Sequence, residues 1–204
     1  SREGALIYSR SASFLLARAA EDVFPGARVL VDYSISRALY CQIKWRRRLT
    51  AADIRQIEGR MRELTGLDEP FEPVSMDAGQ ARAEFLAAGR ADVADLLPEA
   101  GPFRCARSGG RLDAYYGPLA PSTGAISLFR LQYFLPGLLL LLPHMDSPDA
   151  VPQFEELPKV TAAHCESAEF DRLIGVTTVA ALNAAIRDGR ARGIVRVCEA
   201  QQDA

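Results

Sequence analysis

The sequence predicts an α+β fold in which helices pack on antiparallel sheet, followed by a small C-terminal helical segment. An apolar stripe with i, i+4 spacing indicates a first helix, which would begin at Ser9 or Ser11 and run through Asp22. Alternating apolar residues indicate strands in 29–43 and again in 104–142. After a proline-rich connection, helical patterns return. Together these three observations indicate a fold that combines helices with antiparallel strands.

The expected elements follow in chain order. Two strands pair around the polar turn 34–37, and Thr50 with Asp53 resembles a capping box that opens a helix ending before Gly66. The others are a strand over 71–76, a helix over 77–88 capped by Asp77, a short helical piece over 91–97, strands over 104–107, 112–116, 126–134 and 138–142, a helix over 160–174, a helix from Thr178 to Gly189, and a final strand or linker over 194–198.

A cluster of prolines marks the expected domain boundary. Pro143, Pro148, Pro152 and Pro158 fall within sixteen residues, a density typical of a surface connection. We therefore expect an α+β domain over residues 1–145, and a proline-rich connection with a helical segment over 146–204.

Composition excludes several broad classes of protein. The chain has 204 residues, 49% of them hydrophobic and 25% charged, and its net charge is -2, from 24 basic and 26 acidic residues. This near balance removes a global electrostatic case for binding nucleic acid or an anionic membrane. The longest apolar run, 138–142, is far shorter than the roughly 20 residues of a membrane span, and no secretory signal begins the chain. We expect a cytoplasmic protein without a membrane partner.

Cysteine and histidine are too sparse for an obvious metal site. The four cysteines lie far apart without a C-x-x-C pair, and His144 and His164 are the only histidines. Zinc sites need such ligands in close spacing. We expect reduced cysteines and no metal in this chain.

A basic run is the candidate contact for nucleic acid or nucleotide. Lys44, Arg46, Arg47 and Arg48 surround Trp45, a composition suited to phosphate contact beside a stacking platform. The plainer interpretation, a solvated turn after a strand, has the greater weight because the chain is nearly neutral.

A tyrosine-containing segment is the candidate for lining a pocket. Tyr115 and Tyr116 end a predicted strand, and Ser122 and Thr123 follow in a loop rich in proline and glycine. Such loops often line binding sites. An aromatic pair that only packs beneath a turn is an equally weighted alternative.

These residues resemble the second, editing domain of threonyl-tRNA synthetase. The segment 10–17 reads Arg-Ser-Ala-Ser-Phe-Leu-Leu-Ala, where that family has a helix with His-Ser-x-x-His-Leu-Leu-Ala. The resemblance continues in the same order through Phe24-Pro25-Gly26, the capped helix from Leu49-Thr50 with Ile57-Glu58-x-Arg60-Met61, and Gly117-Pro118 followed by Pro121. It implies an editing-domain-like fold.

A resemblance over nearly the whole chain is to the N-terminal part of bacterial uridine kinase-like nucleoside kinases. It rests on short matches in order, none of which is decisive alone. They are Tyr116-Gly117, Pro121 to Gly124, Phe129, Leu131, Pro136-Gly137, Phe154-Glu155-Glu156-x-Pro158-Lys159, Gly175-Val176-x-x-Val179, Leu182-Asn183 and Glu199-Ala200. In that family a P-loop kinase domain, which would need ATP and Mg²⁺, follows this region. We expect a longer parent whose kinase domain lies beyond residue 204 and is this domain's partner.

The resemblance also implies what this domain has lost. The synthetase removes misattached serine from tRNA with two helical histidines and a Cys-x-x-x-His pair, whose places are taken here by Arg10, Phe14, Tyr115 and Leu119. These side chains cannot act together as neutral base, metal ligand and thiolate. No residue is therefore expected to be catalytic.

What remains is expected to be a cleft that binds a small anionic or nucleoside-like ligand, or a regulatory module of the kinase. The candidate ligand-binding residues are Arg10, Ser11, Ser13, Asp113, Tyr115, Tyr116, Ser122 and Thr123. Three alternatives stay open: a deacylase with rearranged groups, a tRNA-binding module using Lys44 to Arg48, and a purely architectural domain.

Overall fold

The computed structural model describes residues 1–154 and 158–202. It divides the chain into two compact units, one of Ser1–Ser75 with Arg104–Glu156 and one of Met76–Phe103 with Leu157–Ala204. The boundary expected between residues 145 and 146 stays a prediction. The α+β class with antiparallel pairing is confirmed.

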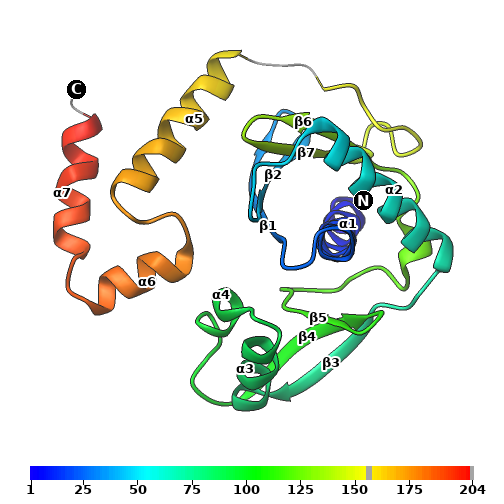
Figure 1. Cartoon of the computed structure of the whole chain (residues 1–204), viewed down its shortest axis with the longest axis horizontal. Coiled ribbons are helices and arrows are strands. Elements are labelled where there is room, and N and C mark those ends of the chain that lie inside the picture. Colours follow the sequence, from blue (N-terminus) through cyan, green and yellow to red (C-terminus); the bar gives the residue numbers. More distant parts are fainter. Residues whose placement is uncertain (155–157, 203–204) are drawn as a thin grey trace. The chain divides into compact units, whose positions relative to one another are not determined.

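Helix α1 (Arg2–Val23) is the central element of the first unit (Figure 1). Ser1 caps it by accepting a hydrogen bond from the Gly4 amide at 3.2 Å. The expected start at Ser9 or Ser11 is wrong. Inside the helix the hydroxyls of Ser11 and Ser13 donate to carbonyls four residues back, which serine can do without ending a helix.

A four-stranded antiparallel sheet lies beside α1, with the strand order β1-β2-β7-β6. The hairpin of β1 and β2 forms as the alternation predicted, and β7 is buried along its whole length. The predicted strand over 126–134 is shorter in the structure, because residues 126–129, which follow the 3₁₀ turn η1 (Thr123–Ala125), are irregular. The strands are β1 (Arg28–Ile35), β2 (Ala38–Lys44), β6 (Arg130–Phe134) and β7 (Gly137–Leu141).

Helix α2 (Ala51–Leu67) packs against α1 and β6 and completes the core of this unit (Figure 1). The predicted capping box is confirmed: the Asp53 amide donates to the Thr50 hydroxyl at 3.3 Å, and the Thr50 amide donates to the Asp53 carboxylate at 2.7 Å. The apolar stripe of α2 is buried in the core against α1 and not in a binding site. The fully buried apolar side chains of α1 and α2 are Ala12, Phe14, Leu15, Leu16, Ala19, Ala20, Ile57, Met61 and Leu64.

A three-stranded sheet, ordered β3-β4-β5, carries the segment that leads to the candidate site. Its strands are β3 (Glu72–Asp77), β4 (Pro102–Ser108) and β5 (Arg111–Asp113). The turn at Gly109-Gly110 joins β4 to β5, and both glycines have positive φ. The expected strand over 112–116 ends at Asp113, so Tyr115 and Tyr116 lie in an irregular segment.

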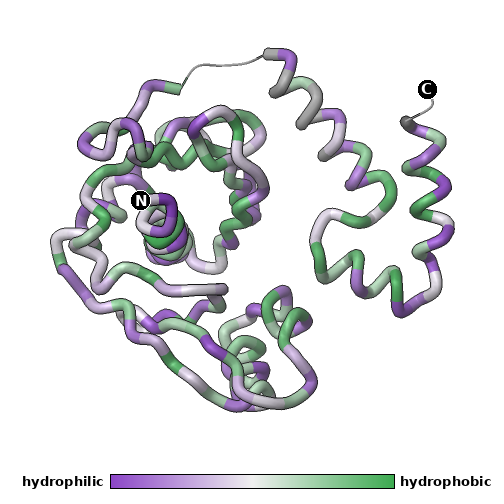
Figure 2. Tube along the Cα trace, turned by 180° about the vertical axis from the view of Figure 1, so that it is seen from behind, coloured by the Kyte–Doolittle hydropathy of each residue, from purple (hydrophilic) through white to green (hydrophobic). Residues whose placement is uncertain are grey.

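The second unit is mostly helical. Asp77 caps α3 (Ala78–Ala87) as predicted, and the short α4 spans Ala91–Ala94. Helices α5 (Pro158–Leu173), α6 (Val179–Arg187) and α7 (Ala191–Gln202) follow, with Thr178 as the N-cap of α6. The expected strand or linker over 194–198 is wrong. Its β-branched residues lie on α7, along which hydrophobic and hydrophilic residues alternate (Figure 2).

Among the described residues, the structure contains no helix long and apolar enough to cross a membrane.

Two glycine-to-alanine substitutions should have opposite effects on stability. A Cβ at Gly137 would collide with the Cys41 carbonyl where β7 meets β2, whereas a Cβ at Gly59 in the middle of α2 meets nothing within 4 Å. Gly137→Ala should lower the free energy of unfolding by about 1–3 kcal/mol, and Gly59→Ala should raise it by up to about 1 kcal/mol. Urea unfolding measures both. Equal effects would contradict this packing of β7.

Candidate functional site

A cavity of about 500 Å³ lies in the first unit, between β3, β4 and the segment after β5. Its volume lies within the range typical of sites for small organic molecules. Most of its lining is apolar. The lining residues are Phe71, Pro73, Val74, Ser75, Arg104, Cys105, Ala106, Tyr115, Gly117, Pro118 and Leu119.

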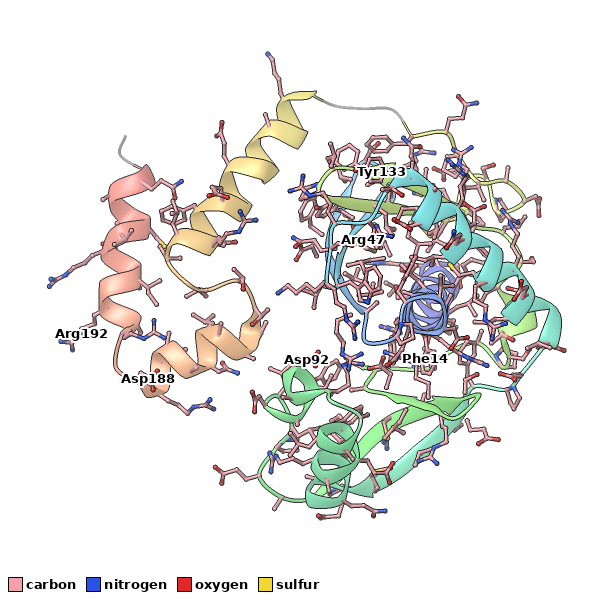
Figure 3. The ribbon with its side chains drawn as sticks, in the orientation of Figure 1. Phe14, Arg47, Asp92, Tyr133, Asp188 and Arg192 are labelled. Carbon is pink, nitrogen blue, oxygen red and sulfur yellow. The ribbon has the colours of Figure 1, made fainter. Side chains whose placement is uncertain are left out.

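An aromatic cluster joins this cavity to α1. The ring of Phe14, labelled in Figure 3, stacks on that of Tyr115 with centroids 5.4 Å apart and meets Phe71 edge-on at 5.2 Å. Phe14 is fully buried, whereas Tyr115 and Phe71 also line the cavity. Tyr115 is thus the predicted ligand-binding residue that the structure places in the cavity wall.

Arg10 lies one helical turn before Phe14 and packs against Gly117. A Cβ built on Gly117 would lie 2.7 Å from Nη1 of Arg10, and Gly117 has a φ of +115°. Both the close approach and the backbone conformation therefore require glycine here. Arg10 is partly buried, and its guanidinium makes no hydrogen bond or ion pair with any described residue.

Arg104 and Cys105 are cavity residues that the sequence analysis missed. Arg104 is exposed and has no hydrogen-bonding or ionic partner in the described part of the chain. Cys105 is buried, and its thiol donates to the Val74 carbonyl at 3.6 Å. Residues 104–106 become wall residues because β4 pairs with β3, some 30 residues earlier, and sequence alternation does not reveal that pairing.

Ser11 and Ser13 have places in α1 that do not favour the expected donor role. The Ser11 hydroxyl is fully buried, where it donates to the Ile7 carbonyl at 2.8 Å and accepts from the Ala120 amide at 2.7 Å. Ser13 donates to the Ser9 carbonyl at 2.9 Å. Neither serine lines the cavity. Ser11 instead ties α1 to the segment after the cavity wall.

Asp113, at the end of β5, is held in an ionic network. Its carboxylate pairs with Arg111 at 3.0 Å and accepts from the Ala114 amide at 3.0 Å. Arg111 also contacts Glu21 of α1. Asp113 is buried and does not line the cavity, so the geometry gives it a positioning role for the segment that begins at Ala114.

The other predicted loop residues also lie outside the cavity wall. Tyr116 is 79% exposed. Ser122 donates to the Asp68 carboxylate, and the buried Thr123 hydroxyl donates to the Leu64 carbonyl at 2.7 Å and accepts from the Glu69 amide at 3.0 Å. These two residues attach their loop to the end of α2. Ligand roles for them stay predictions, which this geometry does not favour.

In the basic run 44–48, some side chains form contacts with described residues and others have no ionic partner among them. Trp45 packs on Phe24 with centroids 4.8 Å apart, donates to the Pro25 carbonyl at 3.2 Å, and has the Arg47 guanidinium 5.2 Å from its ring centre. Arg47, labelled in Figure 3, forms a two-pronged ion pair with Asp53 at 2.7 and 2.9 Å. The indole is therefore engaged in local packing and is not an open stacking platform.

The remaining cations of the run are exposed. Lys44 and Arg48 line a hollow of about 240 Å³ beside Gly137, and Arg46 lies outside it. In the described part of the chain the side chains of all three have no ionic partner. Nucleic-acid contact through them stays a prediction.

Asp53 is the group whose acidity the fold changes most clearly in this region. The hydrogen bonds from Arg47, then that from the Thr50 amide, hold the pKa of its carboxyl well below the ordinary value of 3.8. Arg47 and Asp53 thereby fix the loop between β2 and α2.

Sequence comparison relates the chain to threonyl-tRNA synthetases. Over 133 residues, 64% of its length, it is 31% identical to the threonine–tRNA ligase of Burkholderia multivorans and 32% identical to that of Paraburkholderia phymatum. It therefore carries a threonyl-tRNA-synthetase-like domain. The chain spans only about a fifth of these relatives, 21% of each. No protein-family model matches the chain.

The fold agrees with this similarity, and the expectation of an editing-domain-like α+β fold is confirmed. Of the four positions that the resemblance pairs with the synthetase's catalytic groups, two line the cavity and the other two contact residues that line it. Tyr115 and Leu119 line it, Phe14 stacks on Tyr115, and Arg10 packs against the lining residue Gly117.

The two serines of α1 allow a test of structural against ligand-binding roles. Ser11→Ala leaves the buried Ala120 amide without its acceptor and should cost about 1–3 kcal/mol of unfolding free energy. The matched Ser13→Ala should change it by less than about 0.5 kcal/mol. Denaturant unfolding of both variants measures the difference. A Ser11→Ala variant as stable as the parent chain would contradict the bridging role.

Asp53→Asn should change the acid dependence of stability. The pKa of Asp53 is lower in the folded state, so between the folded and the unfolded pKa the folded state binds fewer protons than the unfolded chain. The Asp53 carboxylate therefore stabilises the fold fully above about pH 4, the unfolded pKa. Its contribution decreases as the pH falls below that value. The variant should melt below the parent chain at pH 7, with the gap shrinking as pH falls through 4. Asp149→Asn, at an exposed position, is the control. A difference in melting temperature that does not change with pH would contradict the lowered pKa of Asp53.

Proposed function

We propose that this chain is a non-hydrolytic ligand-binding domain of a protein that resembles an ATP-dependent uridine or nucleoside kinase. The observation that supports it is the stack of Phe14 on Tyr115 beside the cavity. The site has a cavity of ligand size, and aromatic packing occupies two of the four positions that the resemblance assigns to catalytic groups, Phe14 and Tyr115.

Ester hydrolysis needs a group that accepts a proton from water and a group that stabilises the oxyanion. Phe14 and Leu119 carry no group that accepts a proton, and a guanidinium has only hydrogen-bond donors, so Arg10 cannot serve as the base. Arg10 could still bind a negative charge, which favours binding over turnover.

The kinase parent rests on the ordered matches described above and remains the finer part of the proposal. Residues 155–157, within one of those matches, lie outside the described residues. A Gly-x-x-x-x-Gly-Lys-Ser sequence soon after residue 204 in the gene would support it. In such a parent this domain would bind a ligand that regulates the kinase domain, the partner that needs ATP and Mg²⁺.

A deacylase with rearranged groups is the second candidate. Cys105 favours it, because a thiol in a cavity wall is a potential nucleophile. The contact of its sulfur is with the Val74 carbonyl, however, which cannot act as a base. A nucleophilic cysteine needs a base or a cation that stabilises its thiolate, and this hydrogen bond supplies neither.

Deacylation of seryl-tRNA distinguishes the two functions. The 204-residue chain should release serine no faster than the uncatalysed reaction, and Arg10→Ala and Cys105→Ala should leave that rate unchanged. The same preparation should gain thermal stability with a ligand that fits the cavity. Turnover that either substitution abolishes would overturn the non-hydrolytic assignment.

A further inference from the structure

The chemistry of the cavity indicates the kind of molecule it takes, if the chain is the ligand-binding domain proposed above. We infer that the ligand is a small amphipathic anion, an apolar ring system that carries one carboxylate or phosphate group. Three features of the described residues carry this inference: an apolar wall, two cations without partners, and few neutral hydrogen-bonding side chains.

The wall favours an apolar ring. Seven of its members present aromatic or aliphatic surface, and burial of apolar ligand area is the main source of affinity in such sites. Tyr115 is held in place by its stack on Phe14, so a ligand ring would meet an ordered aromatic surface. The seven are Phe71, Pro73, Val74, Ala106, Tyr115, Pro118 and Leu119.

The charges favour an oxyanion. Arg104 lines the cavity, and the partly buried Arg10 packs against the wall at Gly117. Among the described residues no carboxylate lines the cavity, and neither guanidinium has an ionic partner. A guanidinium binds carboxylate or phosphate through paired N–H groups, and this attraction is stronger near apolar surface than in open water.

The sparse neutral polar groups argue against an uncharged nucleoside. Ser75 and the Tyr115 hydroxyl are the neutral side chains of the described lining that carry an oxygen. A ribose and a base edge together bring several donors and acceptors, and each one buried without a partner costs binding free energy. A ring with one anionic group leaves fewer such groups unpaired.

Isothermal titration calorimetry of the full chain tests the inference with five probes. Indole-3-acetate and phenyl phosphate carry a ring with an anion, and each represents one source of the oxyanion. Indole-3-acetamide lacks the charge, acetate lacks the ring, and uridine represents a neutral nucleoside. At least one of the two aromatic anions should bind about tenfold or more tightly than the other three probes.

Substitutions locate the charge contact. Arg104→Gln or Arg10→Gln should weaken the tighter aromatic anion about tenfold and leave indole-3-acetamide unchanged. Arg46→Gln is the matched control, because it removes the same charge from an exposed arginine that does not line the cavity. Equal weakening by Arg46→Gln would mean a general charge effect and would overturn the inference.

The remaining outcomes separate this inference from the proposed function. Uridine or the amide binding as tightly as both anions would overturn the ligand class while the binding function stands. Binding by no probe would overturn the ligand class, and hydrolysis of seryl-tRNA by the same preparation would then overturn the proposed function as well.

Discussion

The burial of α1 is the constraint on which the first unit depends. Phe14, Leu15, Leu16 and Ala19 are all fully buried, so apolar surface faces outward around most of the helix and must be covered on several sides. The four-stranded sheet, α2 and the segment after β5 provide that cover. Ser11, one of two buried polar residues of α1, is satisfied by hydrogen bonds to Ile7 and Ala120. The cavity adjoins this cover, because Phe71 and Tyr115 pack on Phe14 and also line the cavity, whereas no residue of α1 lines it.

The same helix determines what the cavity can do chemically. Arg10, Phe14 and Arg18 are spaced four residues apart and so share one face. Arg18 is buried and pairs with Glu69, Phe14 joins an aromatic cluster, and Arg10 keeps its charge without a described partner. One face of a helix therefore carries a structural ion pair, a packing ring and a free cation within two turns. Arg10 packs against a residue that lines the cavity, whereas Arg18 and Glu69 are not lining residues.

Local signals predicted most of the fold. The capping box at Thr50, the hairpin of β1 and β2, and the caps of α3 and α6 formed as expected because each depends on neighbouring residues. The start of α1 was misplaced because a serine that bonds back within a helix looks like a cap in sequence. Ile194, Val195 and Val197 suggested a strand, since β-branched residues favour strands when their context is not known.

The candidate site was predicted less completely than the fold. Tyr115 was found because it belongs to an aromatic segment, and Arg10 because it replaces a residue of a recognisable motif. Arg104 and Cys105 were missed because they enter the wall through long-range pairing of strands. Ser11 and Thr123 were predicted as ligand-binding residues because of their hydroxyls, but in the structure these hydroxyls form hydrogen bonds with backbone groups. A polar side chain in sequence does not reveal whether its hydrogen bonds are already satisfied.

The contact between Phe14, Phe71 and Tyr115 also bears on how this domain could change through evolution. A histidine at position 14 would place a polar ring against the rings of Phe71 and Tyr115, whose carbon atoms offer it no hydrogen bond, and burying it there would cost free energy. A cysteine at position 115 would remove the ring that Phe14 stacks on and leave a void. Each of these single substitutions thus loses packing, whatever chemistry the new side chain brings. The contacts among the three rings therefore make positions 14 and 115 resistant to change one at a time, so that a replacement at one of them is best tolerated together with a compensating replacement at the other.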